Sequence, residues 1–537
     1  MKKQLTLITA LLLANIVNAQ WQWAKQIGGP NSDGGGILSD INNNIYCIGY
    51  FGNSCYLDND TLYSIGYNDI FFAKYDNAGS EIWAKHIGGN NPFNINEYPS
   101  GIVIDNNIFI YLSGEFYGTL IIDSYTISSS GGLDMFLAKF DLNGNCLWLK
   151  KAGSALDDDS RTVSIDPNGN VYWAGNFNSP GGMVDTIPIG KGWFLAKFDT
   201  NGNLISVTPD FINRGAPSCL TVTNNEIIVC GNTYDSLIIN TTDTLIGNSI
   251  DGFLFKMDLS LNVIWAKRFG GNTSSWDYPA NFEQDVNGNI YLVGGFQDSL
   301  SIDTATITNN GKKDMFFAKF NSSGNLVWVK QTNTTGAFTT MANMIKKDND
   351  GFFYITGSFC GNASFGSYNV STTNNQDVFI ARYDDSGDCL GVRHFGFAVG
   401  GSIATDSNGE IIIAGGFSNT INIGSTSLTS HGGGDIFFAK SDAITSIGGE
   451  QRKANNELII YANPNQGKCN ITIPDDFLNE ANLVLSIYDN TGKIIQQKTL
   501  EMNDGKIKLN LEQEAKGVYN VVLSNKKKSY NGKIVFE

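Results

Sequence analysis

Residues 69–76 read Asp-Ile-Phe-Phe-Ala-Lys-Tyr-Asp, and this string decides the fold. With minor variation, the pattern Asp-x-Phe-apolar-Ala-Lys-aromatic-Asp occurs seven times at intervals of 58 to 65 residues. The copies occupy residues 69–76, 134–141, 192–199, 251–258, 314–321, 377–384 and 435–442. Self-similarity at a nearly fixed period is typical of repeat architectures, so this region is expected to be one domain built from seven units.

Each copy of the string belongs to a unit of four strands. Its alternation predicts a strand, and a turn such as residues 143–145 leads to a second strand that carries Trp-x-Lys. After Gly-Gly and a polar loop, two further strands flank an Asp-x-Asn-Gly-Asn turn, as at residues 166–170. Four closely connected strands predict an antiparallel meander. The Trp positions are Trp83, Trp148, Trp265 and Trp328, with degenerate copies around Ser206 and Val392. Because the Trp residues share one structural position, we expect them to pack between repeats rather than to stack on sugars.

The ends of the repeat region indicate how the units are arranged. A four-stranded sheet with two apolar faces needs neighbours on both sides, so the copies must stack as a closed ring or an open array. The seventh copy ends at Asp442 without its Trp-x-Lys strand, whereas residues 23–25 near the N-terminus are an orphan copy of that strand. We therefore predict an all-β fold with a seven-bladed β-propeller whose N-terminal strand closes the last blade.

The chain of 537 residues is acidic, with 36 basic and 52 acidic side chains and a formal charge of -16. This charge repels phosphate backbones and anionic lipid head groups, so nucleic acid and membrane surfaces are not expected partners.

The first 19 residues have the layout of a secretory signal. Lys2 and Lys3 precede an apolar stretch at residues 5–17, and a small-residue cleavage site ends at Ala19. We expect a signal peptide at 1–19, a mature chain from Gln20 and no transmembrane segment.

The repeats resemble a known family. The patterns Gly-Asn-apolar-Tyr-x-x-Gly-x-Phe and Asp-x-Phe-apolar-Ala-Lys-Phe-Asp-x-x-Gly-Asn-x-x-Trp-x-Lys are similar to the SBBP β-propeller repeats of secreted bacterial proteins. The resemblance covers residues from about 21 to 442, and we place the propeller domain at 20–442. It implies the architecture, and it implies no single chemistry.

A different module follows the repeats. Residues 443–456 are small and polar and are interpreted as a linker, and seven short strand candidates in 457–537 predict a small Ig-like β-sandwich. The blocks at residues 461–467, 485–493, 517–523 and 533–537 resemble the C-terminal sorting domain of type IX secretion in Bacteroidota, although Ala462 departs from the usual Tyr or Pro. The resemblance implies contact with the type IX machinery and an extracellular or cell-surface location. An accessory carbohydrate-binding or Ig-like module is the alternative.

Candidate ligand-binding residues lie in the loops after Gly-Gly, which share one face of the predicted ring with the long loops around residues 123–127 and 303–307. They are the aromatic pair Trp276 and Tyr278 beside Asp277, the pair Glu97 and Tyr98, and Asp158 in the acidic run 157–159. Glu97 and Asp277 could meet as a carboxylate pair at the mouth of the ring. Loop packing and simple solvation are the alternatives.

No cofactor is expected. Calcium could bind at the Asp-x-Asn-Gly-Asn turns or at residues 157–159, but a calcium loop needs more oxygen ligands than one acid per turn provides. His86, His394 and His431 are the only histidines, and no nucleophile elbow or phosphate loop stands in a fitting context. We favour a non-enzymatic protein, with a polysaccharide hydrolase or lyase as the catalytic alternative.

One of the possible cysteine pairs has a favourable register. A turn at residues 224–225 would set Cys219 opposite Cys230, at a site with the wider Cα separation, where a disulfide is allowed but not favoured. From the whole sequence we predict a secreted or cell-surface β-propeller that binds or adheres to an unidentified glycan or protein. A structural component of a surface complex is the alternative.

Overall fold

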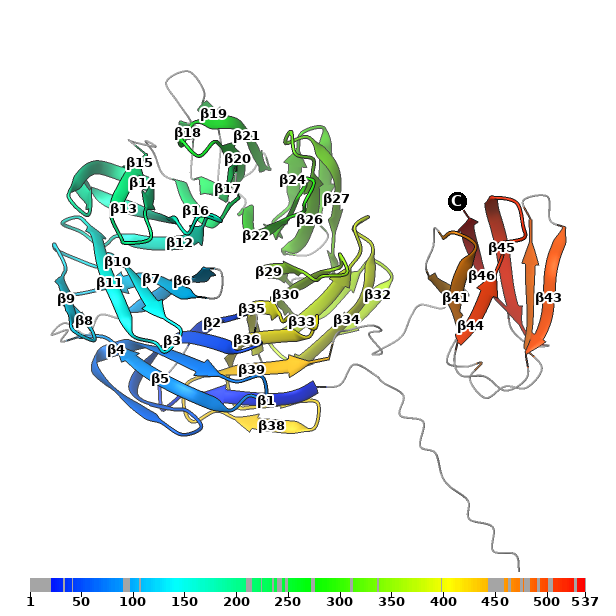
Figure 1. Ribbon diagram of the computed structural model, residues 1–537, viewed down its shortest axis with the longest axis horizontal. Coiled ribbons are helices and arrows are strands. Elements are labelled where there is room, and N and C mark those ends of the chain that lie inside the picture. The colour runs from blue at the N-terminus through cyan, green and yellow to red at the C-terminus, as the bar shows by residue number, and fades with distance from the viewer. Residues whose placement is uncertain are drawn as a thin grey trace, which may run out of the picture. The chain divides into compact units, whose positions relative to one another are not determined.

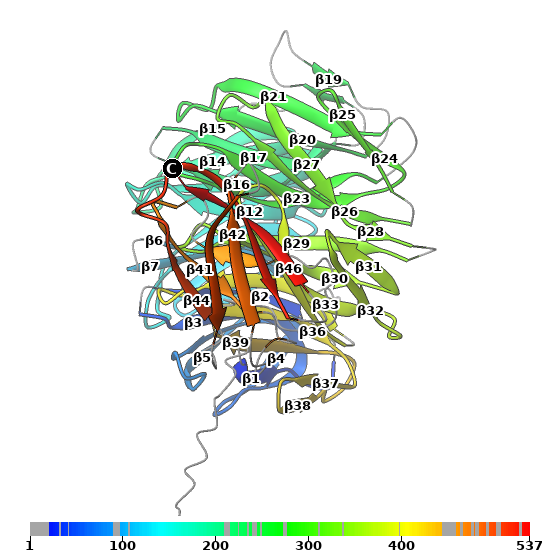
Figure 2. The same cartoon turned by 90° about the vertical axis from the view of Figure 1, so that its right-hand side faces the viewer.

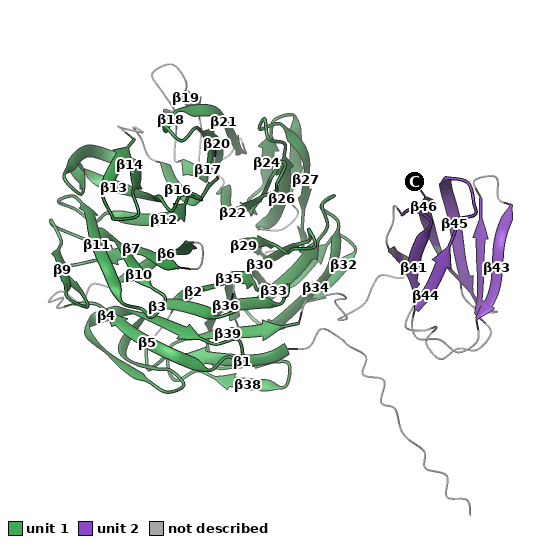
Figure 3. Cartoon of the chain, in the orientation of Figure 1, with its two compact units in different colours: residues 1–450 green, residues 451–537 purple. Residues whose placement is uncertain are grey.

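The computed structural model describes most of the chain as β-strand. It describes residues 21–31, 34–40, 42–89, 97–105, 108–208, 215–223, 225–233, 236–238, 244–246, 250–271, 276–309, 312–335, 338–396, 398–442, 458–461, 465–473, 477, 483–489, 493–500, 506–525 and 529–536. Every regular element in these residues is a strand, so the all-β prediction is confirmed. The chain divides into two compact units, residues 1–450 and 451–537 (Figure 3). The expected signal peptide at 1–19 and linker at 443–456 lie outside the described residues.

The first unit is built from four-stranded antiparallel sheets, and the strand pairing in its described residues gives seven of them (Figure 1). We call them blades 1 to 7. Blades 1 to 3 are β2 (Gly34–Ser39), β3 (Ile45–Tyr56), β4 (Thr61–Tyr75) and β5 (Glu81–Ile87); β6 (Tyr98–Asp105), β7 (Phe109–Phe116), β10 (Asp134–Asp141) and β11 (Cys146–Gly153); β12 (Asp159–Ile165), β13 (Val171–Val184), β14 (Ile187–Phe198) and β15 (Leu204–Val207). Blades 4 and 5 are β16 (Gly215–Val222), β17 (Ile227–Thr233), β20 (Asp251–Met257) and β21 (Val263–Gly270); β22 (Tyr278–Gln284), β23 (Ile290–Phe296), β26 (Asp314–Phe320) and β27 (Leu326–Gln331). Blades 6 and 7 are β29 (Thr340–Lys347), β30 (Phe353–Phe359), β33 (Asp377–Tyr383) and β34 (Cys389–Gly396); β35 (Ala398–Thr405), β36 (Ile411–Phe417), β39 (Asp435–Ser441) and β1 (Trp21–Ile27).

Five blades have a hairpin of two short strands between their second and third strands. The hairpins are β8 (Thr119–Ile122) with β9 (Tyr125–Ser128), β18 (Ser236–Ile238) with β19 (Thr244–Ile246), β24 (Ser299–Ile302) with β25 (Ala305–Thr308), β31 (Asn362–Phe365) with β32 (Tyr368–Ser371), and β37 (Thr420–Ile423) with β38 (Thr426–Thr429). In blades 1 and 3 the hairpin is part of the long strands themselves, β3 with β4 and β13 with β14. β28 (Asn333–Thr334) follows blade 5 and pairs with β31 of the next blade.

The blades close into a ring. The first strands of successive blades contact one another in the order β2, β6, β12, β16, β22, β29, β35, and β35 contacts β2 again. These first strands form the innermost ring of strands of the first unit (Figure 1). The last blade takes its outermost strand from the other end of the chain, because β1 pairs antiparallel with β39, with Trp23 opposite Lys440. The N-terminal strand therefore completes the last blade, as its orphan Trp-x-Lys sequence predicts.

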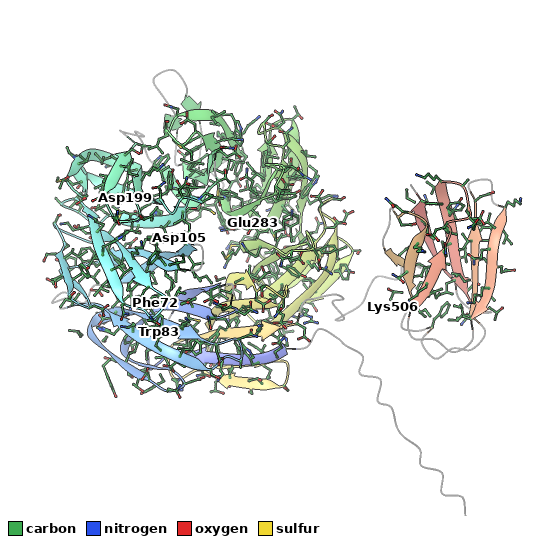
Figure 4. All side chains as sticks on the ribbon, in the orientation of Figure 1. Phe72, Trp83, Asp105, Asp199, Glu283 and Lys506 are labelled. Atoms are coloured by element: carbon green, nitrogen blue, oxygen red, sulfur yellow. The ribbon has the colours of Figure 1, made fainter. Side chains whose placement is uncertain are left out.

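The apolar core lies between the blades rather than in one central mass. In the described residues of unit 1, seven clusters of buried side chains each join two neighbouring blades. Between blades 1 and 2, the ring of Phe72 is 4.9 Å from Trp83 and 5.3 Å from Phe140 of the next blade (Figure 4). Replacing such a buried Phe by Ala typically costs about 3–5 kcal/mol, so the interfaces between blades hold the ring together.

The repeated Trp, Lys and Gly form a clasp between one blade and the next. Trp83 Nε1 and Lys74 Nζ of blade 1 both donate to the Leu142 carbonyl oxygen of blade 2, at 3.4 and 3.2 Å. Gly144 in the same turn has φ +79°, and a Cβ there would lie 3.1 Å from the Trp83 ring. Glycine suits this turn because it adopts positive φ without strain and leaves room for the ring. The repeated Trp residues therefore pack between blades, as their shared position predicts.

Two junctions lack this clasp. Each lacks both the Trp of one blade and the glycine turn of the next. In blade 3 the Trp position is Ser206, opposite Lys197, and the turn of blade 4 carries Leu261 at φ +69° instead of glycine. Leu261 packs against the core between blades 3 and 4, in the region that a Trp ring fills elsewhere. In blade 6 the Trp position is Gly391, opposite Arg382, and blade 7 has no such turn because its last strand is β1.

The second unit is a sandwich of two antiparallel sheets around one apolar core (Figures 1 and 2). One sheet has the order β40 (Ile459–Tyr461), β41 (Lys468–Thr472) and β44 (Lys506–Asn510). The other has the order β43 (Ile494–Leu500), β42 (Leu483–Tyr488), β45 (Gly517–Ser524) and β46 (Ser529–Phe536). Alternating side chains such as Leu485, Ile487, Val521 and Leu523 are buried between the sheets.

Candidate binding surface at the channel mouth

The antiparallel meander puts different loops on the two faces of the ring. Tight turns join the first strand to the second and the third to the fourth, and all of them lie on one face, the turn face. The opposite face, the loop face, carries the starts of the innermost strands and the connections between blades. Figure 4 labels Asp105 and Asp199, which begin turns of the two kinds on the turn face.

The Asp side chains of the turn face are used to build the turns. Asp166 Oδ1 accepts the amides of Asn168 and Asn170, both at 2.9 Å, and Asp166 Oδ2 accepts the Asn170 side-chain amide at 2.8 Å. The same pattern recurs at Asp199, where the Asn203 side chain and the surrounding amides lower the pKa of the carboxyl. These hydrogen bonds account for the Asp-x-Asn-Gly-Asn sequence without a metal ion. No group of three or more His, Cys, Asp and Glu residues in the described part of the chain could hold a metal ion, and the expectation that no cofactor is bound stays a prediction.

The three histidines all bond to an aspartate that stands at the same position of the repeat. Each bonds to the Asp that begins the repeated string: His86 to Asp69, His394 Nδ1 to Asp377 at 2.9 Å, and His431 Nδ1 to Asp435 at 2.7 Å. Arg268 takes the same role in blade 4, donating Nε and Nη2 to Asp251 at 2.9 and 2.5 Å. The string therefore keeps a buried carboxylate that a side chain of the outer strand compensates, and in blade 7 His431 of the preceding loop contributes as well.

The structure buries the predicted acids of the loop face. Asp158 and Asp277 are 1% and 0% exposed and occupy equivalent positions before the innermost strand. Asp277 accepts the amides of Gly271 at 2.8 Å and Gln297 at 3.1 Å. Asp158 accepts the amides of Ser154 at 2.5 Å and Asn178 at 3.0 Å. Both carboxylates fasten the connection between two blades, so they do not present their oxygens to a ligand in this structure.

Glu97 occupies the same position in blade 2 but behaves differently. It is 0% exposed, and no group of the described residues makes a well-aligned hydrogen bond to either carboxyl oxygen. Burial, and then the charge of Asp69, raise the pKa of Glu97 to about 10, against a smaller lowering by the Gly89 amide. Glu97 is therefore neutral at physiological pH. It lies at the entry to blade 2 and Asp277 at the entry to blade 5, so the structure does not bring them together as a pair.

The predicted aromatic residues divide between surface and sheet. Trp276 is 55% exposed, and Lys313 Nζ lies 5.1 Å from the centre of its ring. Tyr278 begins β22 and lies against Gly295 of β23, and burial raises its pKa to about 12. Trp276 therefore remains a candidate ligand contact. Asp277, between Trp276 and Tyr278 in the sequence, is buried.

Tyr98 belongs to a cluster of chemically varied side chains at the channel mouth. Its ring meets that of Tyr50 edge to face at 4.8 Å, and across the sheet it pairs with Glu115. Glu115 Oε1 accepts the Ser160 amide of blade 3 at 2.9 Å. Burial, and then the charge of Asp159, raise the pKa of Glu115 to about 7.

Asp159 and Arg161 complete this cluster. Arg161 Nη2 lies 3.1 Å from Asp159 Oδ2, which also accepts the side-chain amide of Asn178 at 3.2 Å. A β-bulge between Ser160 and Thr162 interrupts the strand pairing at Arg161, and bulges commonly redirect a side chain. We call Tyr50, Tyr98, Glu115, Asp159 and Arg161 the mouth arc.

The mouth arc departs from the repeat in a way that the sequence shows only once the register is known. At the position of Glu115, blades 5, 6 and 7 have Gly295, Ser358 and Gly416. The bulged residues that correspond to Arg161 are Ser100, Ser218, Ala280, Asn343 and Gly401. Sequence reasoning missed Glu115, Arg161 and Tyr50, although a charged residue among small neutral ones was the available signal. Two aromatic rings, two carboxyl groups and a guanidinium can hydrogen-bond and stack on a ligand rich in hydroxyl groups.

Cys219 and Cys230 lie directly opposite each other on β16 and β17, as the hairpin register predicts. Both are buried, and both are free thiols in this structure. Asn224, in the turn between them, lies outside the described residues.

Comparison with protein families identifies both parts of the chain. Residues 22–50 match the SBBP family model, described as a beta-propeller repeat. Residues 459–537 match the model of the secretion system C-terminal sorting domain. The chain thus carries an SBBP repeat and a type IX sorting domain, and the sorting domain indicates export to the cell surface or the extracellular space. None of the helices in the described residues is long and apolar enough to cross a membrane.

Two curated proteins are similar to parts of the chain. An uncharacterized WD repeat-containing protein, L264, of Acanthamoeba polyphaga mimivirus is 24% identical over 414 residues, which are 65% of this chain and 26% of that protein. The regulatory protein FlaEY of Caulobacter vibrioides is 24% identical over 192 residues, 35% of this chain and 19% of that protein. The matches thus span about a quarter and a fifth of these relatives.

Among solved structures, the Dos1 propeller has 9% sequence identity and a TM-score of 0.40, with 81% of this chain and 97% of that chain covered. Cobalt-substituted Synechocystis apocarotenoid oxygenase has 10% identity and a TM-score of 0.32, with 92% and 98% covered.

Proposed function

We propose that this exported protein, with its SBBP β-propeller repeat and its type IX sorting domain, is a carbohydrate-binding protein of the cell surface or its surroundings. The ligand site is the mouth arc on the loop face of the propeller. One observation carries the proposal: charged and aromatic side chains gather there at positions that small or neutral residues fill in most other blades.

The chemistry of the mouth arc suits a polyhydroxylated ligand. The carboxylate of Asp159 and the guanidinium of Arg161 can each bond two neighbouring hydroxyl groups, and the tyrosine rings offer apolar edges for the ring carbons of a sugar. Glu115, with a pKa near 7, can donate as well as accept a hydrogen bond at neutral pH. The residues that recur in every blade hold the blades together. They do not explain why charged and aromatic side chains gather at the mouth arc.

The mature chain, residues 20–537, tests the proposal on a glycan array and in pull-downs with extracellular material. Arg161→Ala and Asp159→Asn should weaken glycan binding about tenfold or more each, since a hydrogen bond to a charged group contributes about 1.5–3 kcal/mol. The matched control is Lys330→Ala on the outer strand β27. Lys330 is 44% exposed and makes an ion pair of 3.1 Å with Asp388, against 39% and 3.1 Å for Arg161 and Asp159. Retention of a protein partner alone, or equal glycan binding by both variants and wild type, contradicts a carbohydrate site at the mouth arc.

A second function, as a structural component of a surface assembly, has its own supporting observation. Six outer strands each expose one aliphatic side chain at the same position, between 36% and 56% exposed: Ile82, Leu147, Ile205, Ile264, Val327 and Leu390. A regular apolar band on the rim suits lateral packing against other proteins. Replacing three of these residues by Ser should release the protein from envelope complexes while leaving glycan binding unchanged.

A further inference from the structure

The junction between blades 6 and 7 is built differently from the others. A single residue, 397, connects Gly396 at the end of β34 to Ala398 at the start of β35. The corresponding connection between blades 4 and 5 runs from Gly270 to Tyr278. The junction between blades 6 and 7 therefore has almost no connecting loop to cover it.

A second contact that seals other junctions is also lacking here. The hairpin of the following blade pairs with the end of the preceding outer strand through β11 and β13, β21 and β24, and β28 and β31. In the described residues, β37 and β38 form a sheet of two strands with no ladder to β34. β37 lies beside β34, but no backbone ladder joins the outer strand of blade 6 to the hairpin of blade 7.

A hollow of about 400 Å³ lies at this junction. Asn374, His394 and Phe395 line it from blade 6, and Thr420 and Asn422 line it from blade 7. This volume is within the range of sites that hold small molecules. None of the residues that line the hollow is an Asp, Glu, Lys or Arg, so its wall is neutral and polar.

The wall of the hollow is held in place. Asp377, which is 3% exposed, accepts the side-chain amide of Asn374 at 2.8 Å and bonds His394 Nδ1 at 2.9 Å. In the neutral tautomer whose Nδ1 donates to the carboxylate, Nε2 of His394 can accept a hydrogen bond, and the amide oxygen of Asn374 is a second acceptor. The ring of Phe395 is fixed edge to face against Trp21 at 5.7 Å and Phe437 at 5.3 Å.

We infer that this hollow is a second ligand site, separate from the mouth arc, and that it binds a neutral sugar unit. Amide, hydroxyl and imidazole groups donate to and accept from sugar hydroxyls, and Phe395 supplies an aromatic surface for the ring carbons. A carboxylate or ammonium on the ligand would find no opposite charge among the lining residues, so charged sugars bind less well.

Ligand-observed NMR on the mature chain, with a panel of neutral monosaccharides and their uronic acid and amino-sugar counterparts, tests this inference. A neutral sugar should give saturation transfer, and Asn422→Ala should weaken its binding about threefold to tenfold, as expected for the loss of one hydrogen bond. Asn422→Trp, which fills the hollow, should abolish the binding. The matched control is Ser301→Ala, because Ser301 has the same position in the hairpin of blade 5, where β24 pairs with β21.

Three results would overturn the inference. They are silence of the whole neutral panel, equal binding of charged counterparts, and wild-type binding by Asn422→Trp. Loss of the signal in Arg161→Ala but not in the Asn422 variants would assign the sugar to the mouth arc instead. Because the two sets of variants lie in blade 3 and blade 7, failure of one site leaves the other testable.

Discussion

One methylene group separates Glu97 from the aspartates that occupy its position in other blades. Asp158 and Asp277 reach the amides of the connection between blades, and those hydrogen bonds stabilise their buried carboxylates. Within the described residues, the longer Glu97 has no well-aligned hydrogen-bond partner for either oxygen, and burial raises its pKa to about 10. A buried carboxyl without donors is expected to keep its proton.

This difference gives a pH prediction. The pKa of Glu97 is raised in the folded state, so between pH 5 and 9 the folded chain holds a proton that the unfolded chain has lost, and the free energy of unfolding falls as pH rises. Relative to Glu97→Gln, which has no proton to lose, the wild type should lose up to about 1.4 kcal/mol per pH unit. Urea unfolding of both proteins at pH 5.5, 7.0 and 8.5 measures the slope. Parallel curves would show that Glu97 is already ionised in the folded protein.

The cysteine pair gives a second prediction at this scale. In an oxidising export compartment, Cys219 and Cys230 should lose two hydrogens to a disulfide-exchange partner and form one bond, because they face each other across β16 and β17. Alkylation of the unreduced mature protein, followed by peptide mass spectrometry, should find this pair linked. Cys47 should stay a thiol, since burial raises its pKa. Alkylation at both Cys219 and Cys230 without reduction would refute the bond.

Individual site residues were the hardest to predict from the sequence. The acids Glu97, Asp158 and Asp277 have the sequence context of polar loop residues, and only the folded structure shows that they are buried. Conversely, Glu115 lies in a stretch with the sequence of a buried strand, and Arg161 lies at a bulge that has no sequence signal of its own. Burial depends on neighbours that are distant in the chain, which a single sequence does not show.

At the scale of elements, the sequence was a better guide. The alternating string and its Trp-x-Lys partner predicted the strands and their antiparallel order, because each blade is made of consecutive segments joined by tight turns. The pairing of a hairpin with the preceding blade was not predicted, and neither was the open junction between blades 6 and 7. Both depend on the lengths of connections that differ from one repeat to the next.

The two halves of the clasp should depend on each other. Ser206→Trp alone should destabilise the protein by about 1–3 kcal/mol, because the ring would compete with Leu261 for the same space. Adding Leu261→Gly should recover most of this loss, because the new Trp and Gly would pack as Trp83 and Gly144 do between blades 1 and 2. A double-mutant cycle in urea would measure a coupling of at least about 1 kcal/mol. Additive effects of the two changes would show that the blade 3 junction cannot form a clasp.

Removal of β1 should open the ring. Without residues 21–27, β39 has an unpaired edge, so thermal unfolding should broaden and the protein should associate with itself at high concentration. Calorimetry and size-exclusion chromatography measure both effects. A synthetic peptide of residues 21–27 should reverse them, whereas the same peptide with Ala24→Pro should not, since proline cannot donate to the ladder. An unchanged melting profile would mean that β1 is dispensable for closure.

At the scale of the whole molecule, the two units have separate tasks. The propeller carries the candidate binding sites, and residues 459–537 match the sorting domain. A chain that stops after residue 450 should therefore fold but accumulate in the periplasm, and cell fractionation with immunoblotting would detect it there. Full-length Arg161→Ala is the control, because it changes the mouth arc and keeps the sorting domain. Appearance of the truncated chain at the surface would show that the second unit is not required for export.

The pairing of β1 with β39 also sets the order of events in folding. Trp23 leaves the ribosome among the first residues and Lys440 hundreds of residues later, yet they are neighbours in one sheet. Closing a loop of this length costs about 2 kcal/mol more entropy than closing one a tenth as long. Six blades can form as the chain emerges, but the seventh stays incomplete until its third strand arrives. The first strand of the propeller therefore has no partner strand until the last repeat has been made.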